Sequence, residues 1–208
     1  NVRIKQIHME EDAGKLVHDI REDTTHVDFN RTSVPLIEIV SQPDLSSAEE
    51  VEAYLERLKD LLRYAKVAEC EMAHGTMRCD VNLSVRPAGT DILGVRTEMK
   101  NMNSIEAIKR AIEYETARHI DAIENGTEVL RQETRRWDDI KGKSYAMRTK
   151  ETAGDYRYFP DPNVMPVVID DAWFDEIKSS LPEFPEVKRE RYMSEYGLGE
   201  YDTEQITK

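Results

Sequence analysis

The 208-residue sequence has the composition of a globular protein, with 39% hydrophobic and 34% charged residues. No apolar run approaches the ~18 residues that a membrane-spanning helix needs, and no secretory signal is present, so we expect no membrane association. The formal net charge of −13 excludes a protein that coats nucleic acid non-specifically, although a local basic patch remains possible. Cys70 and Cys79 match no zinc or redox spacing, which indicates a reducing compartment.

The N-terminal stretch predicts a strand over residues 2–9 that ends in three consecutive carboxylates. His8 and Glu10 share one face if the strand continues that far. Glu10, Glu11 and Asp12 repel one another unless a cation or solvent relieves them. A metal site and a solvated acidic turn are both consistent with the local sequence.

Residues 27–44 contain an apolar run, Leu36–Val40, with one carboxylate inside it. Such a run is typical of a buried strand, so we expect Glu38 to need a partner. Arg31 and a metal ion are candidates, and a structural ion pair is the simpler alternative.

Two amphipathic helices form the predicted scaffold. The first begins at Ser46, whose spacing to Glu49 is that of a capping box. The second follows a similar pair, Asn103 and Glu106, and ends at Gly126, the usual helix-closing residue. We assign no chemistry to either helix.

The stretch 78–100 predicts an antiparallel hairpin with one apolar and one charged face. The apolar face of its first strand comprises Cys79, Val81, Leu83 and Val85. The polar face of that strand comprises Asp80, Asn82, Ser84 and Arg86, and the second strand adds Arg96, Glu98 and Lys100. This mixture of signs suits the floor of a site for a metal ion and a phosphate, whereas a lone hairpin of this kind is more often a solvated surface. His74, just upstream, is a ligand candidate or a loop residue.

A second hairpin is predicted from residues 130–137 and 144–150. It carries the best local basic patch of the chain: Arg131, Arg135, Arg136, Arg148 and Lys150. Contact with a phosphate or an RNA backbone is the sharper interpretation, and a solvated edge is the alternative. Residues 155–163 predict an ordered loop, and a helical character begins near residue 170.

Seven stretches together resemble the GatB family of aspartyl/glutamyl-tRNA amidotransferase subunits. They follow the family's order: IHMEEDAGK, VDFNRTSVPLIEIVSQPD, RCDVNLSVRP, TEMKNMNS, QETRRW, MRTKE and DYRYFPDP. The resemblance covers essentially the whole chain and implies an α+β fold, a mostly antiparallel sheet with flanking helices. It implies a glutamine synthetase-like catalytic (cradle) domain over 1–169 and the start of a helical tail domain over 170–208. Since the chain starts at Asn1 rather than Met, we expect part of a longer protein that is inactive alone and binds tRNA weakly.

The resemblance also implies a reaction. Misacylated Glu-tRNA(Gln) or Asp-tRNA(Asn) is activated by ATP at its side-chain carboxylate, and ammonia then displaces phosphate. Ammonia comes through a channel from an amidase subunit (GatA), and a small subunit (GatC) clamps the two, in the cytoplasm or an organellar matrix. The alternative is a tRNA-docking and assembly scaffold without chemistry of its own.

Site residues follow from the resemblance and the strand pattern. The implied catalytic residues are Glu11, Arg86, Arg96, Lys100 and Asp161. The implied Mg²⁺ ligands are Glu11, Asp80 and Glu98, with His8, Glu10 and His74 as further candidates. The chain departs from the family at Ser33, at Asn163 and at Ala73-His74-Gly75-Thr76, and the last change puts a contact from that loop in doubt.

Overall fold

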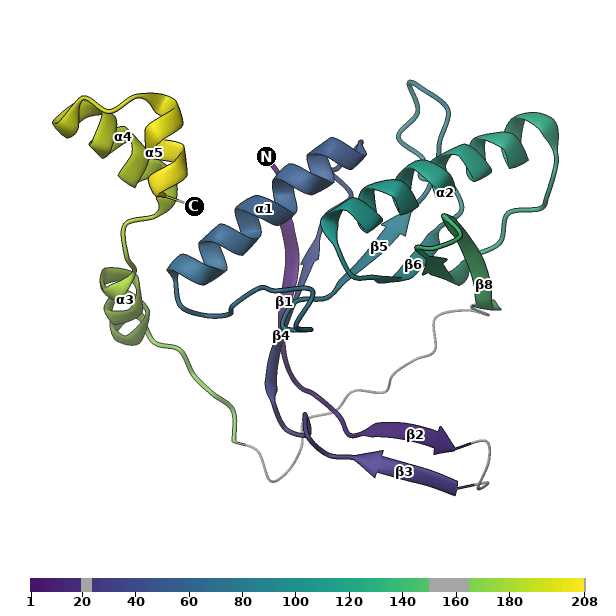
Figure 1. Cartoon of the computed structure of the whole chain (residues 1–208), viewed down its shortest axis with the longest axis horizontal. Coiled ribbons are helices and arrows are strands. Elements are labelled where there is room, and N and C mark those ends of the chain that lie inside the picture. The colour runs from purple at the N-terminus through teal and green to yellow at the C-terminus, as the bar shows by residue number, and fades with distance from the viewer. Residues whose placement is uncertain (20–23, 150–164, 208) are drawn as a thin grey trace. The chain divides into compact units, whose positions relative to one another are not determined.

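The computed structural model describes residues 1–19, 24–149 and 165–207, which contain eight strands and five helices in an α+β arrangement (Figure 1). The strands are β1 (Ile4–Glu11), β2 (Lys15–Asp19), β3 (Thr24–Asp28), β4 (Pro35–Ser41), β5 (Cys79–Leu83), β6 (Thr97–Met102), β7 (Glu133–Asp138) and β8 (Lys143–Thr149). The helices are α1 (Ala48–Tyr64), α2 (Ile105–Asn125), α3 (Asp171–Ser180), α4 (Pro185–Tyr196) and α5 (Glu200–Ile206). These elements fall into two compact units, 1–46 and 47–208.

The first unit consists of two antiparallel strand pairs, β1 with β4 and β2 with β3. Every residue of β1 is exposed, because a two-stranded sheet has too little mass to cover its own faces. Glu38 is also exposed, so the prediction that it is buried is wrong. Arg31 does not pair with it as predicted: its Nε lies 2.8 Å from Oδ2 of Asp12.

The second unit is built on a four-stranded sheet with the order β5-β6-β7-β8. Both predicted hairpins are confirmed: β5 and β6 pair antiparallel, as do β7 and β8. The pairing of β6 with β7 is parallel. Since the other four pairings in the described part of the chain are antiparallel, the predicted fold class is confirmed. The domain boundary expected at residue 169 stays a prediction.

The core of this unit lies between the sheet and the first two helices. Figure 1 shows α2 lying across the sheet with α1 beside it. Met99, Ile108, Ala111 and Trp137 are buried there, and Leu55 contributes from α1. On β5, the apolar side chains predicted to be buried are half-buried and pack against this core. The alternation read from the sequence of β5 is therefore confirmed.

Both scaffold helices begin one residue later than the capping patterns predicted. The N-cap of α1 is Ser47, whose side chain accepts a hydrogen bond from the Glu50 backbone N–H. The N-cap of α2 is Ser104, which accepts from the Ala107 N–H at 3.0 Å. Gly126 closes α2 in the left-handed conformation, as predicted.

The three C-terminal helices are shorter and more exposed. The hydroxyl of Tyr64 on α1 donates a hydrogen bond to the Thr207 carbonyl at 3.0 Å, and Nε of Arg189 on α4 reaches the Thr207 hydroxyl at 2.7 Å. Among the helices that the structure describes, none has the length and apolar character needed to cross a membrane.

The N-cap assignment of α2 gives a first prediction. Replacing Ser104 with Ala should lower the free energy of unfolding by about 1 kcal/mol, because one N–H of the first turn loses its acceptor. Asn103→Ala is the matched control, since the sequence pattern would have made Asn103 the cap. Urea denaturation of the two variants distinguishes them, and a larger loss in Asn103→Ala would contradict the assignment.

Candidate functional site: a polar sheet face backed by a buried ion-pair network

The polar face of the sheet depends on a bulge in β6. Between the pairs Val81–Met99 and Cys79–Met102, two residues of β6 lie opposite Asp80 alone. The extra residue, Asn101, has a φ of 72°, which asparagine tolerates better than most residues. Its side-chain amide donates to the Trp137 carbonyl at 3.0 Å, which fixes the bulge against β7.

The bulge leaves Asp80 beside Lys100, and the two form an ion pair. The same ammonium group lies 3.0 Å from Oε1 of Glu98. Asp80 and Glu98 therefore lie on one face of the sheet, as the sequence predicted, with one cation between them. Burial alone would lower the pKa of Lys100, but its hydrogen bonds to the two carboxylates outweigh that effect and raise the pKa above its ordinary value.

The same face continues onto β7, which the sequence pattern did not predict. Parallel pairing places Thr134 beside Glu98 and Arg136 beside Lys100. The Thr134 hydroxyl donates a hydrogen bond to Oε2 of Glu98 at 3.1 Å. Arg136 is exposed, and its guanidinium forms no ion pair with any residue that the structure describes. Asp80, Glu98, Lys100, Thr134 and Arg136 are called the open face below.

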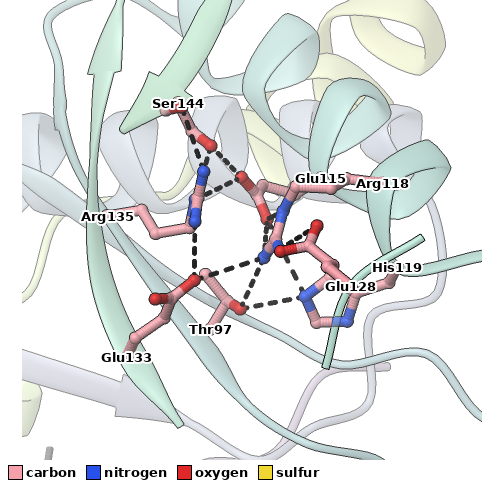
Figure 2. Close-up of polar contacts among 8 residues, drawn as sticks. All are labelled: Thr97, Glu115, Arg118, His119, Glu128, Glu133, Arg135 and Ser144. Atoms are coloured by element: carbon pink, nitrogen blue, oxygen red, sulfur yellow. Dashed lines mark hydrogen bonds and ion pairs between the residues drawn. The ribbon is translucent and has the colours of Figure 1, made fainter. Parts of the chain in front are cut away.

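The opposite face of the same strands meets α2 through a buried ion-pair network (Figure 2). Glu115 is fully buried on α2. Its Oε1 lies 3.1 Å from Nε of Arg135 and accepts from the Ser144 hydroxyl, while its Oε2 accepts from Nε of Arg118 at 2.8 Å. A buried carboxylate requires such compensation, so α2 and the strands β7 and β8 are held in one arrangement.

Further partners extend the network to β6 and to the segment after α2. Glu133 accepts from Nη1 of Arg135 at 2.6 Å, and Glu128 accepts from Nη1 of Arg118 at 2.8 Å. Figure 2 shows both guanidiniums enclosed between carboxylates. The predicted phosphate or RNA contact of Arg135 does not fit this geometry, because its side chain is 12% exposed and is already paired with Glu115 and Glu133.

His119 completes the network, although the sequence pattern assigned it no special role. Its Nε2 lies 2.9 Å from the Thr97 hydroxyl, and the residue is fully buried. Burial lowers the pKa of the His119 ring, and the nearby Arg118 lowers it further. The other nitrogen, Nδ1, is buried with no hydrogen-bond partner among the described residues. One signal for this network is present in the sequence: Glu115, Arg118 and His119 occupy one side of a single helix.

The remaining predicted site residues of this unit lie apart from the open face or outside the described part. Arg86 pairs with Asp91 across the turn after β5, at 3.6 Å. Arg96, Arg131 and His74 are exposed. Lys150 and Asp161 lie outside the described residues, as does the side chain of Arg148.

In the first unit, strand register separates the acidic residues that the sequence grouped. His8 pairs with Glu38 across β1 and β4, and Glu10 lies two residues along on the same face. Glu11 pairs with Pro35 and belongs to the other face of β1. Sequence reasoning did not place Glu38 beside His8, since only the register of β4 reveals it. Whether Glu11 shares a metal ion with Asp80 and Glu98 stays a prediction.

The open face fits a hard divalent cation by its donor chemistry. Two carboxylates already surround one cation there, and Mg²⁺ is commonly bound through one or two carboxylates with the remaining positions left to water and phosphate oxygens. No group of three His, Cys, Asp or Glu side chains converges anywhere in residues 1–19, 24–149 and 165–207. The chain therefore offers a partial ligand set.

Comparison with known proteins identifies a single family. The sequence model of the family described as "GatB/GatE catalytic domain" matches residues 1–175. The chain is 57% identical to the GatB subunit of the aspartyl/glutamyl-tRNA(Asn/Gln) amidotransferase of Caldicellulosiruptor bescii, over 99% of this chain and 43% of that protein. Proteins of the same name from Lachnospira eligens and Lachnoclostridium phytofermentans are each 57% identical, over 99% and 100% of this chain and 42% and 43% of their own lengths. The chain spans less than half the length of these curated relatives.

The buried histidine predicts a dependence of stability on pH. Because the pKa of His119 is lowered in the folded state, the unfolded state takes up the proton first as the pH falls. The free energy of unfolding should therefore be highest above the ordinary histidine pKa of about 6.5 and should decrease as the pH falls through and below it.

The measurement is urea denaturation at pH values from about 7.5 to 5, which lies above the range where most carboxylates titrate. His119→Gln should lose less stability over this range than the unsubstituted chain. His18→Gln removes an exposed histidine and should behave like the unsubstituted chain. Equal losses in all three proteins would contradict the burial of a neutral His119.

Proposed function

The chain belongs to the GatB/GatE catalytic domain family, and we propose that it supplies catalytic residues to a tRNA-dependent amidotransferase. The observation that carries the proposal is identity of 57% over 99% of the chain to a protein named as the GatB subunit of an aspartyl/glutamyl-tRNA(Asn/Gln) amidotransferase. The matched region includes the strands that carry the open face, because the match leaves out only 1% of the chain.

The proposed reaction converts Glu-tRNA(Gln) or Asp-tRNA(Asn) to Gln-tRNA(Gln) or Asn-tRNA(Asn). The side-chain carboxylate of the misacylated tRNA takes a phosphoryl group from ATP, and ADP leaves. Ammonia then attacks the acyl carbon, and phosphate departs as the amide bond forms. Catalysis of the first step consists mainly of positioning and of neutralising phosphate charge.

Asp80 and Glu98 are the residues of the open face that would hold Mg²⁺. The ion, when bound, supplies positive charge to the phosphates of ATP. In the described structure Lys100 occupies the position between the two carboxylates, so its charge is already compensated there. Any cation that binds both carboxylates has to displace the ammonium group, which leaves Lys100 able to face a phosphate.

Arg136 is the second cation proposed to face a phosphate. It lies beside Lys100 on the next strand, and its guanidinium is not paired with a carboxylate in the described part of the chain. A guanidinium presents a planar set of donors that matches phosphate oxygens. Arg131, Arg148 and Lys150 stay proposed contacts to tRNA, and Glu11 and Asp161 stay proposed residues of the ammonia path.

The partners follow from the same proposal. An amidase subunit (GatA) would supply ammonia, a small subunit (GatC) would join the two, and misacylated tRNA would be the substrate. The named relatives come from bacteria, which supports a bacterial cytoplasmic setting. The acidic charge of the chain, −13, opposes long-range approach of tRNA, so most of the RNA affinity should come from other parts of the complex.

Replacing Glu98 with Gln in the intact amidotransferase tests the proposal. The substitution keeps the shape of the side chain and removes its charge, so ATP-dependent amidation of the misacylated tRNA should fall by at least about 100-fold. Glutamine hydrolysis by the amidase subunit should persist, because its chemistry takes place elsewhere. Amidation is measured by separating the aminoacylated products, and glutamate release is measured in parallel.

Glu113→Gln is the matched control. Glu113 is an exposed carboxylate on α2 and should tolerate the change. A scaffold without chemistry would retain full amidation in both variants, and that result would refute a catalytic role for the open face.

A further inference from the structure

We propose that Thr134 is a positioning residue that orients the Glu98 carboxylate for cation binding on the open face. The inference rests on the proposed function of that face. It concerns a residue that does not itself contact the cation and that acts through a single hydrogen bond.

The two oxygens of Glu98 have different neighbours. Oε2 accepts the Thr134 hydroxyl at 3.1 Å, and Oε1 lies 3.0 Å from the Lys100 ammonium. A carboxylate that is free to rotate exchanges its two oxygens, whereas one held at Oε2 presents Oε1 in a fixed direction. The direction of Oε1 is toward Lys100, which also contacts Asp80. The hydrogen bond from Thr134 therefore directs Glu98 to the position of the shared cation.

Thr134 is well suited to this task because it is rigid and buried. The residue is 2% exposed, so its hydroxyl has little access to water and depends on a protein acceptor. Threonine is branched at Cβ, which restricts rotation about χ1. Its backbone is held on both sides, by the parallel pairing with β6 and the antiparallel pairing with β8. The donor thus has a fixed origin on the neighbouring strand.

Strand alternation divides the stretch from Glu133 to Trp137 between two tasks. Glu133, Arg135 and Trp137 face α2, where the first two join the ion-pair network and the third joins the core. Thr134 and Arg136 face the open side, beside Glu98 and Lys100. The network fixes the strand from one face, and this allows Thr134 to act on Glu98 from the other.

The experiment compares Thr134→Val with Thr134→Ser in the intact amidotransferase. Valine keeps the shape and removes the donor, whereas serine keeps the donor. Mn²⁺ alone is the probe, titrated by electron paramagnetic resonance. We expect Thr134→Val to weaken Mn²⁺ binding by about 10-fold to 100-fold and to lower kcat for amidation, and Thr134→Ser to stay close to the unsubstituted enzyme.

Thr97→Val serves as the control for a purely structural effect. Thr97 is equally buried, but its hydroxyl contacts His119 on the opposite face of the sheet. Its replacement should lower the melting temperature without weakening Mn²⁺ binding. A crystal structure of Thr134→Val should show the Glu98 carboxylate rotated away from its present orientation.

A double substitution separates this inference from the proposed function. In a Glu98→Gln background, Thr134→Val should weaken Mn²⁺ binding no further, because its effect passes through Glu98. Unchanged Mn²⁺ binding in Thr134→Val, or an equal additional loss in the Glu98→Gln background, would overturn the positioning role. Failure of the proposed function gives a different result, since Glu98→Gln alone would then leave amidation intact.

Discussion

The buried carboxylate of Glu115 imposes the constraint on which the sheet and its open face depend. Removing one partner from a buried ion pair costs about 3–5 kcal/mol, so Glu115 has to be met by cations wherever α2 packs. Arg118 meets it from the same helix, and Arg135 meets it from β7. Thr97 on β6 and Ser144 on β8 also join the network. Three neighbouring strands are thereby fixed against one helix.

The parallel pairing of β6 with β7 transmits this constraint to the opposite face. In a parallel pair, neighbouring residues share a face, and the next residues along both strands share the other. The pair Thr97–Glu133 lies on the helix side, so the pair Glu98–Thr134 must lie on the open side. The network that compensates Glu115 therefore also places the Thr134 hydroxyl beside Glu98. A structural ion-pair network and a candidate catalytic surface are two faces of the same strands.

Local patterns predicted much of this structure, and long-range pairings account for most of what they missed. Alternation identified both hairpins and the two faces of β5, and the capping patterns placed the helix starts within one residue. No local pattern revealed that β6 and β7 pair in parallel, or that a bulge at Asn101 brings Asp80 beside Lys100. Arg135 and Arg136 look alike in sequence, yet one is enclosed by carboxylates and the other is exposed.

The central claim is that Asp80 and Glu98 form a cation site on the open face. Anomalous diffraction from crystals of the intact amidotransferase soaked in Mn²⁺ tests this claim directly. The account predicts an anomalous peak within about 2.0–2.3 Å of an oxygen from each of these carboxylates, with the Lys100 ammonium displaced from between them. Mn²⁺ bound elsewhere in the same crystals, with Lys100 still between Asp80 and Glu98, would contradict it.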